Sequence, residues 1–398
     1  MRLLHTADWH AGRNLRGIDR TPEIRESLSE ILEIAVSEKV DAILVAGDLF
    51  DSPNPSADAE AAVYDFFLES GALGIPSVVI AGNHDSPQRL ESVSGLLKRV
   101  KVSAFGVMKA DSKAFELELD AGKLVVAGLP FLSERRLVKA ASLMDGEFDT
   151  GVWRQKYREG MGFFIDKLAQ GFQTNAVNVM MLHTTLDGGT LSGSEFSFFV
   201  TNSYAISADQ LPSSAQYVAL GHLHKPQRLG ESPVIEYAGS IVQLDFGEAG
   251  EQKRVNLIEA FPGRPAKVHS IPLSRHKTLK NARVSLDGLE SRLEEFRSFN
   301  GLLKVTVKLE HPMPGLKDRV MGILPNAVAV EVELEEGSAA KRALESQSTQ
   351  SLEPIEAFKK YYSEKRGKDV PIDVQAAFLE LYAQTMGETR ESEGVGSD

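Results

Sequence analysis

AILVAGDLFD, residues 42–51, is a short apolar run followed by a glycine and, within four residues of that glycine, two aspartates. Such a run, bounded by a glycine, is typical of a strand buried on both faces. SVVIAGNHD, residues 77–85, repeats the pattern, and Val63, Phe66 and Phe67 recur between the two runs at helical spacing. Strand, helix and strand in this order predict an α/β sheet with parallel pairs, whose ligands collect beyond the carboxyl ends of the strands.

Polar clusters follow five apolar runs of this kind. Since a buried strand holds its backbone in place, side chains at its tip can converge with those of neighbouring strands on one crevice. The clusters are Asp8-Trp9-His10, Asp48 with Asp51, Asn83-His84-Asp85, His183, and His222-Leu223-His224.

Each cluster alone has a plain structural explanation. Asp8 and His10 are compatible with a turn, Asp48 and Asp51 with an ordinary exit from a strand, and His183 with a packed core histidine. Five clusters in order after five strand patterns are not explained by packing. Carboxylate, imidazole and amide donors together suit divalent cations such as Mn, Fe or Zn, and the two oxygens of Asp48 allow it to bridge two ions.

Composition narrows the class of protein. The 398 residues allow two or three domains, and the absence of cysteine excludes disulfides and thiolate chemistry. The net charge of −12 argues against a protein that coats nucleic acid non-specifically, although bound cations at an acidic site would supply positive charge locally. No apolar run approaches the length of a membrane span, so we expect a cytoplasmic protein without a membrane segment.

A second unit is expected from about residue 278. A helical pattern with Leu289 and Leu293, and apolar runs at 302–309 and 327–334, predict a small α+β domain. A stretch rich in Ser, Gln and Glu follows and is typical of a linker. Two short amphipathic stripes come next, with Ile355, Phe358 and Tyr362 in one and Val374, Phe378, Leu381 and Tyr382 in the other.

The ordered motifs resemble those of a known superfamily. Asp-x-His, Gly-Asp-x-x-Asp, Gly-Asn-His-Asp, His and Gly-His-x-His, in this order, are similar to the calcineurin-like metallophosphoesterases. LHTADWH (4–10), GDLFD (47–51), ALGHLHKPQ (219–227) and YAGS (237–240) resemble, more narrowly, the SbcD family, which forms the nuclease subunit of the bacterial SbcCD complex. An archaeal and eukaryotic meiotic-recombination nuclease is homologous to that family.

This resemblance implies an architecture. It implies an α/β fold, a four-layer α/β/β/α metallophosphoesterase sandwich with a small α+β capping domain and a C-terminal helical hairpin. The expected parts are a nuclease domain over 1–277, a capping domain over 278–336, a linker over 337–352, a helix-loop-helix partner-binding segment over 353–387 and a disordered tail over 388–398.

It also implies roles for the clustered residues. One metal ion would take Asp8, His10, Asp48 and His224, and a second would share Asp48 and take Asn83, His183 and His222. The resemblance makes manganese the expected metal. His84 would contact the scissile phosphate and Asp85 would orient it. Asp51 is a candidate for a role behind the ligands or toward the substrate, because the archaeal and eukaryotic relatives have histidine there.

Two further groups of residues are candidates for binding larger partners. Arg13, Arg16, Lys225 and Arg228 follow the metal motifs and are either solvated loop charges or a basic rim that binds DNA. The stripe residues Phe358, Tyr362, Phe378 and Tyr382 either pack on the parent domains or dock a partner helix. The resemblance implies an SbcC-type, SMC-like ATPase as that partner, and a homodimer within a heterotetramer.

The expected function is therefore a two-metal DNA nuclease, with duplex exonuclease and single-strand or hairpin endonuclease activity, in the processing of DNA double-strand breaks and hairpins. It would act in the nucleoid. Two other classes remain open at this point: a stand-alone phosphatase or nucleotidase on small or protein-bound phosphates, and a non-catalytic scaffold. The complete set of donors argues against the scaffold, and the added C-terminal regions argue against the phosphatase.

Overall fold

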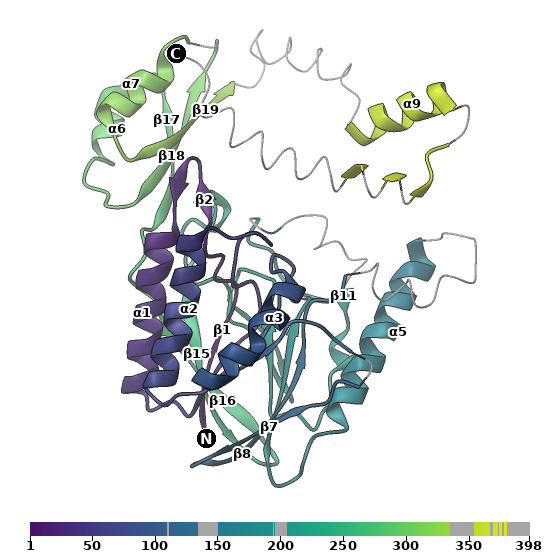
Figure 1. The fold of residues 1–398 in the computed structure, drawn as a ribbon. Helices are drawn as coiled ribbons and strands as arrows, with labels where there is room; N and C mark the ends of the chain where they lie inside the picture. The colour runs from purple at the N-terminus through teal and green to yellow at the C-terminus, as the bar shows by residue number, and fades with distance from the viewer. Residues whose placement is uncertain are drawn as a thin grey trace. The chain divides into compact units, whose positions relative to one another are not determined.

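The computed structural model describes residues 1–109, 111–133, 150–193, 195, 205–311, 313–334, 354–366, 369–372, 374–375 and 378–379. The chain separates into two compact units, one formed by 1–15 with 19–278 and the other by 16–18 with 279–398. The first unit holds two six-stranded sheets, and each unit is described separately below (Figure 1).

The first sheet has the strand order β16-β15-β1-β4-β5-β6. Its four parallel strands are β1 (Arg2–Thr6), β4 (Ala42–Val45), β5 (Ser77–Ile80) and β6 (Val102–Phe105). The strands β15 (Arg254–Phe261) and β16 (Arg264–Pro272) complete the sheet in antiparallel pairing. The sheet is therefore mixed, and the parallel strands place their carboxyl ends at one edge.

The second sheet has the strand order β13-β14-β12-β9-β8-β7. Its parallel strands are β8 (Gly122–Leu129), β9 (Val177–His183), β12 (Tyr217–Gly221) and β14 (Val234–Tyr237). The antiparallel strands β7 (Phe115–Leu119) and β13 (Gln227–Glu231) form its edges. Two short pairs lie outside the sheets, β2 (Asn14–Leu15) with β3 (Ile18–Asp19) and β10 (Thr185–Leu186) with β11 (Ala205–Ile206).

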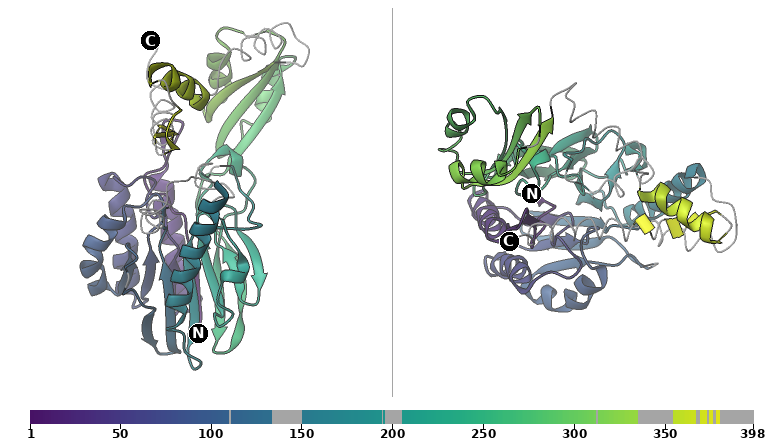
Figure 2. Two further views of the ribbon diagram at one scale, coloured as in Figure 1. Left: turned by 90° about the vertical axis from the view of Figure 1, so that its right-hand side faces the viewer. Right: turned by 90° about the horizontal axis from the view of Figure 1, so that it is seen from above.

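Three apolar clusters hold the layers of this unit together. One cluster joins the facing surfaces of the two sheets and includes Leu44 and Val179. A second packs α1 (Thr21–Ser37), α2 (Ala57–Ala72) and α3 (Pro87–Leu97) on the outer face of the first sheet. The third packs α5 (Thr150–Ala169) on the outer face of the second sheet. Helices thus cover both outer faces, with α5 on the side of the unit opposite α1 and α2 (Figures 1 and 2).

The start of α1 shows how local chemistry places a boundary. The sequence suggests Thr21 as the residue that caps the helix, with Pro22 at the first helical position. In the structure Thr21 is itself the first helical residue, and its backbone N–H and hydroxyl both donate to Asp19 Oδ1, at 2.9 and 2.6 Å. The side chain that accepts a free N–H at the start of α1 is therefore that of Asp19 and not that of Thr21. One carboxylate oxygen accepts both donors of Thr21.

The second unit contains a three-stranded parallel sheet in the order β17-β18-β19. Its strands are β17 (Leu279–Ser285), β18 (Leu302–Leu309) and β19 (Ala327–Leu334), connected by α6 (Leu289–Glu294) and α7 (Leu316–Ile323). One apolar cluster joins the helices to the sheet. The helix α9 (Pro354–Arg366) follows.

The first unit also contains short 3-10 turns. They are η1 (Lys98–Val100), η2 (Ala208–Gln210) and η3 (Phe246–Glu248).

Among the described helices, none combines the length and the apolar character that a membrane-crossing segment needs.

Candidate metal centre

The five polar clusters meet at the carboxyl ends of β1, β4, β5, β9 and β12, as the strand pattern predicts. Ligand atoms within 4.8 Å of one another form three sets: Asp8 with His10 and His224, Asp8 with Asp48 and His183, and His10 with Asp48 and His84. Asn83 joins them, because its Oδ1 lies 2.9 Å from His183 Nε2 and 2.8 Å from His222 Nδ1.

Backbone strain is concentrated among these residues. Asp8, His10, Asp48 and His222 all have positive φ angles, of 51°, 49°, 51° and 101°. Left-handed conformations of this kind are uncommon outside glycine and persist only where the surroundings hold them. Hydrogen bonds between the loops hold them here: Asp8 N–H donates to the Gly47 carbonyl at 3.0 Å, His10 N–H to the Asp48 carbonyl at 3.1 Å, and His222 N–H to Asp8 Oδ1 at 2.9 Å.

Two glycines allow the strand tips to approach one another. A Cβ atom on Gly82 would collide with the backbone nitrogen and carboxylate of Asp48. A Cβ atom on Gly221 would collide with the carbonyl oxygen of Ala46 and with the ring of His183. The glycine in each motif is therefore required by the closeness of the neighbouring loop.

The histidine rings point unshared electron pairs into the cluster. His183 Nδ1 lies 2.8 Å from the Ala46 carbonyl oxygen, which can only accept, so Nδ1 carries the proton. The other ring nitrogen, Nε2, then faces Asp48 Oδ2 at 3.3 Å and Asn83 Oδ1 at 2.9 Å. Three acceptor atoms in contact repel one another unless a proton or a cation lies between them.

The same situation recurs on the other side of Asp8. His10 Nδ1 donates to Asp51 Oδ1 at 3.1 Å and His224 Nδ1 lies 3.3 Å from Glu248 Oε1, while the two Nε2 atoms are only 3.1 Å apart. Asp8 Oδ2 is buried and has no hydrogen-bond partner among the described residues. Converging acceptors and an unsatisfied buried carboxylate oxygen fit a divalent cation, so this donor set is suited to metal.

The pKa values of Asp8 and His183 are raised, so both proposed metal ligands hold a proton when no cation is bound. Burial, together with the nearby Asp48 charge, raises the pKa of Asp8 to about 7. Burial acts to lower the pKa of His183, but the adjacent carboxylates of Asp48 and Asp8 prevail and raise it to about 9. In Asp48 the effect of burial is outweighed by the histidines around it, which hold its pKa well below the usual range.

Metal affinity should therefore rise with pH. Below about pH 9 His183 is protonated in the metal-free chain, and below about pH 7 Asp8 is as well, so a cation must displace these protons. We expect the association constant for Mn²⁺ to increase by about tenfold per pH unit while one such proton is displaced, and to level off above the pKa of His183. Calorimetric titrations between pH 6 and 8.5 measure this slope, and a pH-independent affinity would contradict proton displacement by the metal.

His84 lies at the edge of the cluster. Its backbone N–H donates to Asp48 Oδ1 at 2.8 Å, and its ring lies edge-on to that of His10 at 4.8 Å between centroids. Its Nδ1 lies 2.9 Å from the carbonyl oxygen of Asp51, which fixes a proton on Nδ1 and leaves Nε2 as the other ring nitrogen.

Asp85 has partners different from the one expected. The orienting contact to the His84 ring comes from the Asp51 carbonyl and not from the Asp85 side chain. The Asp85 carboxylate instead accepts the backbone N–H groups of Gly82, Leu49 and Phe50, at 2.8, 3.2 and 3.1 Å. Because these amides belong to two loops, Asp85 joins the loop after β4 to the loop after β5, and burial raises its pKa to about 6.

Three of the four candidate DNA-binding residues form ion pairs with carboxylates. Arg13 lies 3.3 Å from Asp51 and Arg228 lies 2.6 Å from Glu236. Arg16 lies 3.6 Å from Glu331. The positive charge of these three arginines is thus partly balanced by carboxylates, and Lys225 is half-buried next to His224 in the chain.

The candidate partner-binding residues are described in part. The rings of Phe358 and Phe378 are stacked, with centroids 4.1 Å apart and planes at 3°, and Tyr362 lies next to Phe358 on α9. Tyr382 lies outside the described residues, as do most of the residues expected to form the second helix.

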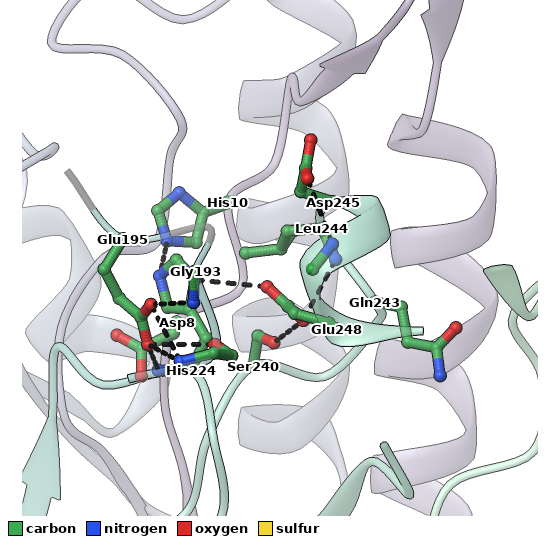
Figure 3. Close-up of polar contacts among 12 residues, drawn as sticks. Asp8, His10, Gly193, Glu195, His224, Ser240, Gln243, Leu244, Asp245 and Glu248 are labelled. Carbon is green, nitrogen blue, oxygen red and sulfur yellow. Dashed lines mark hydrogen bonds and ion pairs between the residues drawn. The ribbon is translucent and has the colours of Figure 1, made fainter. Parts of the chain in front are cut away.

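Several residues of the site were not predicted from the sequence. Glu248 contacts His224 from behind, and Glu195 accepts the backbone N–H of His224 at 3.0 Å (Figure 3). The Phe131 ring is stacked on His222, with centroids 6.1 Å apart. None of the three lies in a strand-tip motif. The one signal in the sequence was the resemblance through YAGS (237–240), which ends eight residues before Glu248.

Fold and site together define a calcineurin-like metallophosphoesterase. Residues 1–226 match the calcineurin-like phosphoesterase family, and residues 272–366 match the family described as the type 5 capsule protein repressor C-terminal domain, SbcD_C. The chain belongs to the SbcD family of nuclease subunits. It is 33% identical over 388 residues to the SbcD subunit of the SbcCD nuclease of Bacillus subtilis, covering 96% of this chain and 97% of that protein.

Two other relatives are described as the same nuclease subunit. The SbcD subunit of the SbcCD nuclease of Rhodobacter capsulatus is 35% identical over 69% of this chain and 70% of its own length. The protein of the same description from Escherichia coli K12 is 26% identical over 89% of this chain and 90% of its own length. The prediction of the family from the strand-tip motifs is thus confirmed, and the similarity extends through the second unit.

Proposed function

We propose that the chain is a DNA nuclease that uses two divalent cations and acts together with an SbcC-type ATPase. Its reactions would be exonuclease cleavage of duplex ends and endonuclease cleavage of single strands and hairpins, in the repair of double-strand breaks. The observation that carries the proposal is the convergence of carboxylate and imidazole atoms in three overlapping sets that share Asp8, His10 and Asp48, with Asp8 Oδ2 buried and without a hydrogen-bond partner among the described residues.

The two proposed sites share one carboxylate. The first consists of Asp8, His10, Asp48 and His224, and the second of Asp48, Asn83, His183 and His222. Oxygen and imidazole donors favour manganese among the abundant divalent ions, as the family resemblance also does. When bound, two cations would neutralise charge on a phosphate diester and lower the pKa of the attacking water.

His84 is the proposed catalytic residue. Its Nδ1 is held by the Asp51 carbonyl, so Nε2 is the ring atom available to the substrate. With Nδ1–H held by the Asp51 carbonyl, Nε2 can donate only in the doubly protonated ring. In that form Nε2–H would donate to a phosphate oxygen in the transition state or pass its proton to the leaving oxygen, which leaves the neutral ring. Asp85 supports this role indirectly, because its three backbone contacts hold the loop on which His84 lies to the loop that carries Asp48 and Asp51.

A phosphatase acting on small esters is the alternative that the metal centre alone would permit. We expect the purified chain with Mn²⁺ to cleave labelled linear duplex or hairpin DNA with a kcat/KM at least about a hundredfold above that for p-nitrophenyl phosphate, since DNA offers binding energy that the small ester lacks. The two rates are measured on one preparation, with and without SbcC and ATP. Efficient turnover of the small ester, with no DNA cleavage in either condition, would favour the phosphatase.

The second unit and the C-terminal segment have proposed roles of their own. Residues 278–336 would form a capping domain that shapes access of DNA, and residues 353–387 would form a helical hairpin, after the linker at 337–352 and before a tail at 388–398. The hairpin would dock on the ATPase through Phe358, Tyr362, Phe378 and Tyr382, in a heterotetramer with a dimer of this chain. The stacked rings of Phe358 and Phe378 support this, because they join two segments into one apolar surface.

Loss of this stack should separate partner binding from catalysis. Phe358→Ala removes one of the two stacked rings, and we expect its affinity for SbcC to fall about tenfold or more, as for a buried aromatic anchor. Turnover of p-nitrophenyl phosphate should be unchanged. Lys359→Ala, which removes a neighbouring charge paired with Glu356 on the same helix, serves as the matched control. Equal partner affinity in both variants would place the interface elsewhere.

A further inference from the structure

A buried ion pair lies behind His224 and has no part in the proposed ligand set. Lys253 Nζ is 2.6 Å from Glu248 Oε2, and neither side chain is exposed to solvent. Removing two charges from water costs several kcal/mol for each ion, so a buried pair of this kind contributes little net stability. Its position relative to His224 suggests another role.

Glu248 contacts the His224 ring and is itself held from several sides. Its Oε1 lies 3.3 Å from His224 Nδ1 (Figure 3). Its Oε2 accepts the hydroxyl of Ser240 and the backbone N–H of Leu244, both at 3.1 Å. The carboxylate is therefore fixed in place, and it accepts a hydrogen bond from His224 Nδ1–H on the side away from the cluster. Despite its burial, Lys253 and His224 hold the pKa of Glu248 well below its usual range, so it is charged.

Lys253 holds the backbone of the same histidine. Its Nζ donates to the carbonyl oxygen of His224 at 3.0 Å and to Glu251 Oε2 at 2.9 Å. One ammonium group is thus bonded both to the main chain of His224 and to the carboxylate that orients its ring. The ring is left with Nε2 directed at His10 Nε2, 3.1 Å away.

His10 has a similar arrangement behind it. Asp51 Oδ1 lies 3.1 Å from His10 Nδ1, and Arg13 lies 3.3 Å from the same oxygen. Both histidines of the first proposed site are therefore backed by a carboxylate and a cation. His183 of the second site is backed by the carbonyl of Ala46. Carboxylates in this position fix the tautomer and increase the basicity of a metal-binding imidazole.

We propose that Glu248, held by Lys253, is a positioning residue that keeps His224 Nε2 directed at the metal and strengthens the site formed with Asp8 and His10. The inference rests on the proposed two-metal centre. Loss of the Glu248 contact weakens one of the two metal-binding steps by about 10–100-fold, the effect typical of a partner behind a metal ligand. The other step, at the site of Asn83, His183 and His222, changes much less.

A purely structural role is the competing explanation, because Glu248 also holds Ser240 and Leu244. Two charge-balanced double variants separate the roles. Glu248→Met with Lys253→Met removes both buried charges and the carboxylate that faces His224 Nδ1. Glu248→Gln with Lys253→Met removes the same charges but keeps an amide oxygen that can accept a hydrogen bond from His224 Nδ1–H. Replacing a buried ion pair as a whole is often neutral for stability, so both variants should fold.

Calorimetric Mn²⁺ titration and the Tm of the metal-free chain are measured for both. We expect the Met/Met variant to lose about 10–100-fold in one binding step and the Gln/Met variant to lose less, at similar Tm values. Glu251→Gln, which alters another contact of Lys253 but none of His224, should bind metal like the unchanged chain. Unchanged affinity in the Met/Met variant, or affinity that only follows Tm across the variants, would overturn the proposal.

A measurement on the unchanged chain guards against variants that do not fold. In the Zn²⁺-loaded protein, ¹⁵N NMR of labelled histidine should show His224 protonated at Nδ1 and coordinated through Nε2. Protonation at Nε2 would overturn the role of Glu248. Failure of the unchanged chain to bind two cations would instead refute the metal centre, so the two failures are distinguishable.

Discussion

Asp48→Asn should abolish nuclease activity and weaken the binding of both metal ions. Asp48 is the one residue assigned to both proposed sites, and its Oδ2 lies 3.3 Å from His183 Nε2 and 3.6 Å from His10 Nε2. Asparagine has nearly the same shape but lacks the charge, so each cation loses an anionic ligand. Since bound metals contribute several kcal/mol to transition-state stabilisation, we expect kcat to fall about a thousandfold or more.

The measurement combines Mn²⁺ titration with cleavage of labelled duplex DNA. Asp41→Asn is the matched control, because Asp41 precedes β4 at the end of the strand away from the site, where its Oδ2 accepts the Arg2 N–H at 2.7 Å. The control should cleave DNA at the normal rate. Two tight binding steps in Asp48→Asn would show that this carboxylate is not shared.

His84→Ala should lose most turnover and keep both metal ions. The ring is held by the Asp51 carbonyl and is not needed to complete either proposed ligand set. General acid catalysis contributes about 10²–10⁴-fold, and we expect kcat to fall by that amount with little change in the Mn²⁺ titration.

The outcome also decides between two roles for this ring. His84, His10 and Asp48 have ligand atoms close enough to hold an ion, so His84 as a ligand is the alternative. Loss of a metal-binding step in His84→Ala would establish that alternative, and full activity would refute any catalytic role. His269→Ala, on the edge strand β16, is the control for replacing a histidine elsewhere in the same unit.

The parts of the fold and site that sequence predicts are those encoded by short stretches of chain. Residues 42–51 contain both a buried strand and the polar residues at its tip, so this one stretch predicts the strand and the candidate metal ligands that follow it. The strands at 302–309 and 327–334 of the second unit were predicted with the bounds observed. A glycine before Asp48, Asn83 and His222 is read from the sequence as a sharp turn, and the structure adds a close approach of the neighbouring loop at Gly82 and Gly221.

The parts that sequence does not predict depend on contacts between distant residues. Glu248 lies 24 residues from His224, in a short 3-10 turn whose sequence has no periodicity to place it. The pairing of Arg13 with Asp51 is not indicated by any sequence pattern, and DNA binding by Arg13 stays a prediction. Asp85 is adjacent to His84 in sequence, yet its side chain turns to the amides of another loop. In each case proximity in sequence was a poor guide to the partner.

Anomalous diffraction from crystals of the Mn²⁺-loaded chain is the most direct test of the two-metal centre. We expect two manganese peaks, one among Asp8, His10 and His224 and the other among Asn83, His183 and His222, with Asp48 in contact with both. A single peak, or peaks outside the ends of β1, β4, β5, β9 and β12, would contradict the two-metal centre.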